Sequence, residues 1–92
     1  MFFYIIADLT VSGSCFVQDE KYYDNVIAKM FAINIESCQM FCWDNDYCQF
    51  WTFYGEGLVE PNCWIHDINA SGKHNLFPYA YRGPRNCPNN GE

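Results

Sequence analysis

Six cysteines are the side chains of this 92-residue chain with the clearest chemical potential: Cys15, Cys38, Cys42, Cys48, Cys63 and Cys87. An even set in a short chain is typical of a disulfide framework formed in an oxidising compartment, although sequence alone leaves about 15 pairings open. The alternative is a zinc site, which would favour C-x2-C pairs or histidines at regular offsets from the cysteines. Neither pattern occurs, so we expect three disulfides and no metal site.

Catalytic groups other than thiols are poorly placed. A catalytic site needs a nucleophile or an acid–base pair with a third group that orients it. His66 and Asp67 are neighbours on an expected strand, so their side chains would point to opposite faces. The Asp44-x-Asp46 pair begins like a calcium loop, but the glycine and glutamate that the loop requires further along are absent. We predict that the chain is not an enzyme and carries no cofactor.

The charge balance narrows the class of partner. Eleven acidic and five basic side chains give a formal net charge of −6. This charge argues against binding to nucleic acid, heparin-like polysaccharide or an anionic membrane, and favours basic or neutral partners. Aromatic residues make up 20% of the chain and charged residues only 17%, which indicates a folded domain with a dense core.

The length suits a single domain, which we place at residues 15–87. Residues 1–14 contain an apolar stretch at 2–7, far shorter than the roughly 20 residues of a membrane helix, and then a polar stretch. We interpret them as a linker, the end of a preceding segment of a larger protein, or residues added for expression. Residues 88–92 are expected to form a polar tail or linker.

Local patterns predict one helix and several strands. Asn34 can cap a helix whose buried face would be Ile35, Cys38, Phe41 and Cys42. Aromatic and β-branched runs predict strands at 48–54, 63–67 and 79–82, with weaker candidates at 16–18 and 25–31. The expected class is α+β, with one helix packed against an antiparallel sheet.

This order of elements resembles the PAN/apple domain, the module of plasma prekallikrein, coagulation factor XI and the apicomplexan microneme adhesins. The residues that carry the resemblance span Cys15 to Cys87: Cys15, the helix Glu36-Ser37-Cys38-Gln39-Met40-Phe41-Cys42, the strand Cys48-Gln49-Phe50-Trp51-Thr52-Phe53, the strand Asn62-Cys63-Trp64-Ile65, Tyr81-Arg82-Gly83 and Cys87. The family implies one helix on a sheet of about five strands, with bridges Cys15–Cys87, Cys38–Cys63 and Cys42–Cys48. The acidic, aromatic-rich composition and the short 48–63 loop favour the microneme branch.

The resemblance also implies a function. We expect an extracellular adhesion module that mediates protein–protein interaction, one of several tandem apple modules in a secreted microneme-type adhesin used in host-cell attachment. Its partner would be another secreted adhesin or a host-surface protein, without nucleic acid binding or direct membrane insertion. The alternatives are a galactose-type lectin module of the same fold and a free-standing secreted inhibitor or toxin. The localisation would be extracellular, through the secretory pathway and the microneme organelle.

Strand alternation suggests one candidate binding surface. If Cys48 and Cys63 both face the helix, one side of the sheet carries Phe50, Thr52, Tyr54 and Ile65, and the other carries Trp51, Phe53, Trp64 and His66. That second, aromatic face would either contact a partner or be covered by the N-terminal part of the domain, with Phe16, Tyr22 and Tyr23 as the covering residues.

A second candidate lies in the loop at 66–75. It gathers His66, Lys73 and His74 close to Tyr79 and Tyr81, and the alternative is an ordinary solvated loop. The same loop contains Asn69-Ala70-Ser71, an N-glycosylation sequon that can be used where the source cell glycosylates secreted proteins.

Overall fold

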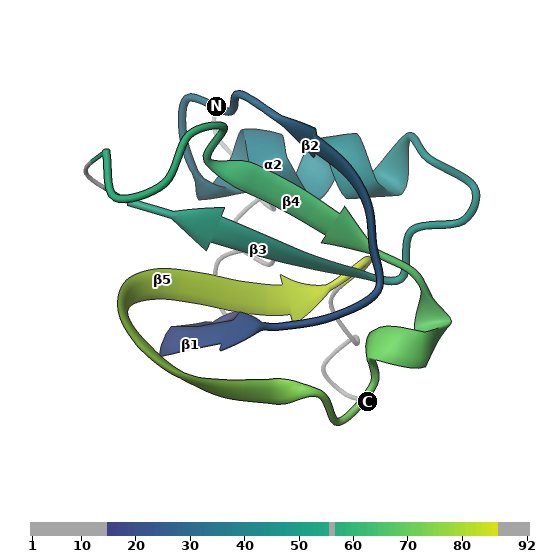
Figure 1. The fold of residues 1–92 in the computed structure, drawn as a ribbon. Coiled ribbons are helices and arrows are strands. Elements are labelled where there is room, and N and C mark those ends of the chain that lie inside the picture. Colours follow the sequence, from purple (N-terminus) through teal and green to yellow (C-terminus); the bar gives the residue numbers. More distant parts are fainter. Residues whose placement is uncertain (1–14, 56, 87–92) are drawn as a thin grey trace, which may run out of the picture.

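The computed structural model describes residues 15–55 and 57–86 and shows one helix packed on a five-stranded antiparallel sheet (Figure 1). The strand order is β1-β5-β3-β4-β2, and every neighbouring pair is antiparallel. The elements are β1 (Val17–Tyr22), β2 (Val26–Met30), α2 (Ile35–Trp43), β3 (Phe50–Tyr54), β4 (Cys63–His66), the 3₁₀ helix η1 (Ile68–Ala70) and β5 (His74–Pro84). The predicted α+β architecture is confirmed.

Helix α2 begins at the predicted cap. The Asn34 side chain accepts a hydrogen bond from the Ser37 N–H at 2.8 Å, and the Ser37 hydroxyl oxygen accepts one from the Asn34 N–H. Such a reciprocal cap satisfies amide groups that the first helical turn leaves unpaired. The buried residues of α2 are Cys38, Gln39 and Cys42, whereas Phe41 is 38% exposed. The prediction of Phe41 on the buried face was wrong, because Gln39 takes the adjoining i+4 position.

Two disulfides hold α2 in place. Cys38 is bonded to Cys63 at the start of β4, and Cys42 is bonded to Cys48 in the loop that leads to β3. These are the two inner bridges that the family resemblance implied. The third predicted bridge, Cys15–Cys87, includes Cys87, which lies outside the described residues.

The prediction of which β3 side chains face the helix was wrong. Cys48 precedes β3, which begins at Phe50, so alternation cannot be counted from Cys48. In the observed register Trp51 lies opposite Ile65, and Phe53 lies opposite Cys63, which is bonded to the helix. Because directly opposite residues of an antiparallel pair share a face, Trp51 and Phe53 face α2.

The other face of the sheet therefore carries a different set of side chains than the one predicted. These are Phe50, Thr52 and Tyr54 from β3, together with Trp64 and His66 from β4. The connection from β1 to β2 joins the two edges of the sheet and crosses this face (Figure 1). Tyr22, the last residue of β1, is 4% exposed, and its ring centroid lies 4.9 Å from that of Phe50, so it covers part of this face. The other two expected covering residues do not: Phe16 packs with Tyr81 against the core under α2, and Tyr23 is 53% exposed.

Trp51 is the largest buried side chain and the centre of the core under α2. Its Nε1–H donates a hydrogen bond to the carbonyl oxygen of Pro84 at 2.8 Å, so the polar edge of the indole is satisfied. The indole also lies directly against Gly83 of β5. A Cβ atom at that position would lie 2.6 Å from Cζ2 of Trp51, which is far inside van der Waals contact.

We predict that Gly83→Ala lowers the free energy of unfolding by about 1–3 kcal/mol, because the indole or β5 must move to admit the methyl group. Urea unfolding at neutral pH measures the change. The control is the same substitution in a Trp51→Phe background, where the smaller ring leaves space and the additional penalty should be close to zero. Equal penalties in the two backgrounds would contradict steric contact as the cause.

Candidate binding groove

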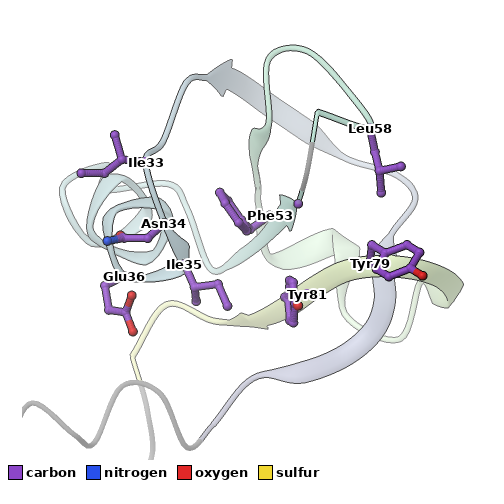
Figure 2. A pocket seen from close by; sticks show the side chains of 9 residues that line it. Ile33, Asn34, Ile35, Glu36, Phe53, Leu58, Tyr79 and Tyr81 are labelled. Carbon is purple, nitrogen blue, oxygen red and sulfur yellow. The ribbon is translucent and has the colours of Figure 1, made fainter.

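An open groove lies between the start of α2, the end of β3 and the middle of β5 (Figure 2). Its volume is about 740 Å³, and its lining is mostly apolar. The lining residues are Ile33, Asn34, Ile35, Glu36, Phe53, Gly55, Leu58, Tyr79 and Tyr81. In Figure 2, Phe53 and Tyr81 lie between the α2 residues on one side and Leu58 and Tyr79 on the other.

The floor of the groove is anchored to the core. The rings of Phe53 and Tyr81 lie 6.4 Å apart between centroids, and Phe16 packs edge-on against Tyr81 at 5.6 Å. Together with Ile35, these three aromatic residues pack against the buried cluster around Trp51. Side chains held in this way lose little further freedom when a ligand binds, so the floor is preorganised.

Tyr79 occupies a strained position on the wall of the groove. Its φ angle is +68°, a left-handed conformation that bulky residues rarely adopt. The pairing of β1 with β5 is irregular here, because Gln18 pairs with Tyr81 while Glu20 already pairs with Leu76. Bulges of this kind redirect side chains and are common beside functional sites.

Two hydrogen bonds fix the Tyr79 backbone in that conformation. The Tyr79 N–H donates to Oδ1 of Asp19 at 2.9 Å, and the Gly55 N–H donates to the Tyr79 carbonyl oxygen at 3.0 Å. The Tyr79 side chain nevertheless remains 63% exposed. The strained backbone of Tyr79 therefore does not serve to bury its ring, which suggests that the ring is held exposed to contact a partner.

The rim of the groove adds exposed aliphatic surface and few polar groups. Ile33 is 77% exposed and Leu58 is 45% exposed. The titratable groups of the lining are the Glu36 carboxyl and the two tyrosine hydroxyls. Across residues 15–55 and 57–86, no group of three or more histidine, cysteine, aspartate or glutamate side chains is placed to hold a metal ion. The groove is therefore suited to binding by apolar contact.

The structure separates the eight residues predicted to form a binding surface. Phe53, Tyr79 and Tyr81 line the groove, whereas Trp51 and His66 are fully buried. Trp64 lies on the face of the sheet away from α2, with Nζ of Lys29 4.0 Å from its ring centroid. Lys73 pairs with Asp24 at 3.7 Å and His74 pairs with Glu20 at 3.1 Å, close to where β5 begins. The predicted aromatic face that joins Trp51 to Trp64 and His66 does not exist.

Several groove residues were missed by the sequence reasoning. Asn34 and Ile35 were assigned only to the helix cap and the helix face, Glu36 was named only in the family resemblance, and Ile33 and Leu58 were given no role. The one signal in the sequence is the pair of isoleucines, Ile33 and Ile35, that flank the capping Asn34. Asn69, the sequon residue, lies exposed in η1.

His66 is part of a buried hydrogen-bond chain. Its Nδ1 lies 2.8 Å from the Asp24 carbonyl oxygen, which can only accept, so Nδ1 carries the proton. Nε2 then accepts from the Thr52 hydroxyl at 3.0 Å, and Oγ1 of Thr52 accepts from the Tyr22 N–H at 3.0 Å. Burial lowers the pKa of His66, although the Asp24 carbonyl and the nearby carboxylates of Asp67 and Asp24 act in the opposite direction. His66 thus ties the β1–β2 connection to the sheet as a neutral side chain.

The sign of this pKa shift predicts a stability change with pH. The unfolded chain takes up a proton at His66 near pH 6.5, and the folded chain does so only at lower pH. Stability is therefore complete above about pH 6.5 and falls as the pH drops below it. Urea unfolding between pH 7.5 and 5.5 should show this decline in the native chain and in His74→Gln, and a flatter profile in His66→Gln.

The NMR signals of the His66 ring provide an independent check in the native chain. They should keep their neutral positions as the pH falls just below 6.5, where the same ring in an unfolded chain already takes up a proton. A His66 ring that takes up its proton near pH 6.5, as in an unfolded chain, would contradict the assignment of a buried neutral histidine.

Comparison with known proteins rests on structure alone. No protein-family model matches the sequence, and a search of curated proteins finds no match. The structure is similar to a solution structure of the two N-terminal apple domains of Toxoplasma gondii microneme protein 4, with a TM-score of 0.63 and 22% sequence identity. The similarity covers 77% of this chain and 44% of the matched chain, which holds two domains.

The described residues contain the main elements that were expected for this fold. They are a capped helix, an antiparallel five-stranded sheet and two bridges that fasten the helix to β4 and to the loop before β3. The chain has the fold of an apple domain.

Proposed function

We propose that this domain is an extracellular adhesion module that binds another protein through the groove bordered by Tyr79. The observation that carries the proposal is the strained, exposed tyrosine beside exposed Ile33 and Leu58. Aromatic side chains with neighbouring aliphatic contacts dominate the binding energy of many protein interfaces. When a partner covers exposed apolar surface, each Å² removed from water favours binding by about 25 cal/mol.

A protein partner suits the lining better than a sugar does. Carbohydrate sites need several hydrogen-bonding groups that converge on the ligand beside an aromatic platform. In this groove Oδ1 of Asn34 already caps the helix, and the remaining lining side chains with polar atoms are Glu36 and the two tyrosines. A galactose-type lectin of the same fold is the alternative that the experiment must separate.

The wider context is part of the same proposal. We infer that the domain is one of several tandem apple modules in a secreted, microneme-type adhesin used in host-cell attachment. The fold similarity to apple domains of a microneme protein supports this inference, and the disulfides suit an oxidising compartment. Within the described residues, no helix has the length and apolar character needed to cross a membrane.

Cell binding tests the choice between protein and sugar. The folded domain, displayed on a multivalent support to gain avidity, is applied to cultured host cells. Binding should disappear after trypsin treatment of the cells and should persist after glycosidase treatment and in the presence of free galactose. Inhibition by galactose together with resistance to trypsin would favour the lectin alternative and contradict the proposal.

Tyr79→Gly should separate binding from folding. Glycine adopts positive φ without strain, so the free energy of unfolding should stay within about 1 kcal/mol of the native value. Loss of an interface tyrosine should weaken cell binding by roughly tenfold or more. Tyr23→Gly is the matched control, because Tyr23 is also exposed, at 53%, and does not line the groove. Equal binding by Tyr79→Gly and the native domain would contradict the role of this groove.

A further inference from the structure

A second groove lies beside the edge strand β2, between it and the loop that follows α2. Its volume is about 500 Å³, and it is lined by Ile27, Asp46, Tyr47, Gln49, Asp67 and Ile68. We propose that this groove receives an arginine or lysine side chain from a basic segment of the protein partner. The inference deepens the proposed protein-binding function and rests on it.

The apolar part of the lining suits the aliphatic stem of such a side chain. Tyr47 is 79% exposed, Ile68 is 59% exposed and Ile27 is 38% exposed. Ile27 is the extra residue of a bulge, because Val26 pairs with His66 and Ala28 with Ile65. Long cationic side chains cover apolar surface of this kind with their methylene groups while the charged head reaches a polar partner.

The polar part of the lining suits the charged head. Asp46 and Asp67 contribute two carboxylates to one groove, and no lysine or arginine lines it. Oδ1 of Asp67 accepts a hydrogen bond from the Asn69 N–H at 2.9 Å, which caps η1. The Asp46 carboxylate makes no hydrogen bond or ion pair with any residue in 15–55 or 57–86. A guanidinium or ammonium group placed here would be attracted by both carboxylates.

The five basic residues of this sequence are already engaged, so none of them is available to fill the groove. Each contacts a ring, a polar side chain or carbonyl oxygens: Lys21 lies over Phe77, Lys29 lies over Trp64, Lys73 bonds Asn25, Arg82 pairs with Glu20, and Arg85 donates to the carbonyls of Trp43, Asn45 and Cys48. A second copy would have to break one of these contacts, and its net charge of −6 would repel the first. Charge complementarity therefore favours a basic partner.

NMR titration of the ¹⁵N-labelled domain with N-acetyl-arginine amide at low ionic strength tests the inference. The backbone amides of Ile27, Tyr47 and Ile68 should shift in a saturable way. N-acetyl-citrulline amide has nearly the same shape without the charge and should bind at least about tenfold more weakly. Absence of saturable shifts, or an equal response to citrulline, would overturn the proposal.

Charge-neutral variants locate the site. Asp46→Asn with Asp67→Asn removes both charges, while the amide oxygen of the new side chain at position 67 can still cap η1, and arginine binding should fall at least about tenfold. Asp24→Asn with Glu60→Gln changes the net charge equally, and because neither residue lines this groove or the one beside Tyr79, arginine binding should be unchanged. Equal losses of arginine binding in the two double variants would show a general charge effect and contradict the site.

If the native domain binds cells but not the arginine probe, this inference fails while the proposed function stands.

Discussion

The bridge between Cys38 and Cys63 is the constraint on which the rest of the domain depends. Helix α2 has nine residues, too few to be stable in isolation. The bridge ties the buried face of the helix to β4, across 25 residues of sequence, and a loop of that length restricts the unfolded chain by roughly 3–4 kcal/mol. With the helix fixed over the sheet, Trp51 is enclosed against Gly83, and the other face of the sheet is left for the β1–β2 connection to cover.

Much of this fold could be predicted from the sequence, because its strongest signals are local. Asn34 caps the helix through its own side chain, and the aromatic and β-branched composition of β3 marks a strand whatever lies next to it. The orientation of β3 could not be predicted, because alternation needs the true start of the strand. Cys48 lies in the loop before that start, where side chains do not alternate as they do in a strand, so counting from it put Trp51 and Phe53 on the wrong face.

The groove was only partly predictable, because it depends on irregular backbone. Tyr79 was predicted as a binding residue because of its aromatic ring. Its positive φ angle could not be predicted, because that conformation is normally adopted by glycine or asparagine. The Asp19 carboxylate that holds it comes from β1, sixty residues earlier. Ile27 likewise faces its groove through a bulge in β2. The bridges and the buried indole stabilise the middle of the sheet, while the bulges present apolar side chains near its edges.

The central claim is that the exposed side chain of Tyr79 contacts a protein on the cell surface. Photo-crosslinking tests it most directly, with a photoreactive phenylalanine derivative in place of Tyr79 or of the control residue Tyr23, followed by irradiation on host cells. We expect a covalent adduct with a discrete cell-surface protein from position 79 and none from position 23. Cell binding without any adduct from position 79, or adducts of equal yield from both positions, would contradict the claim.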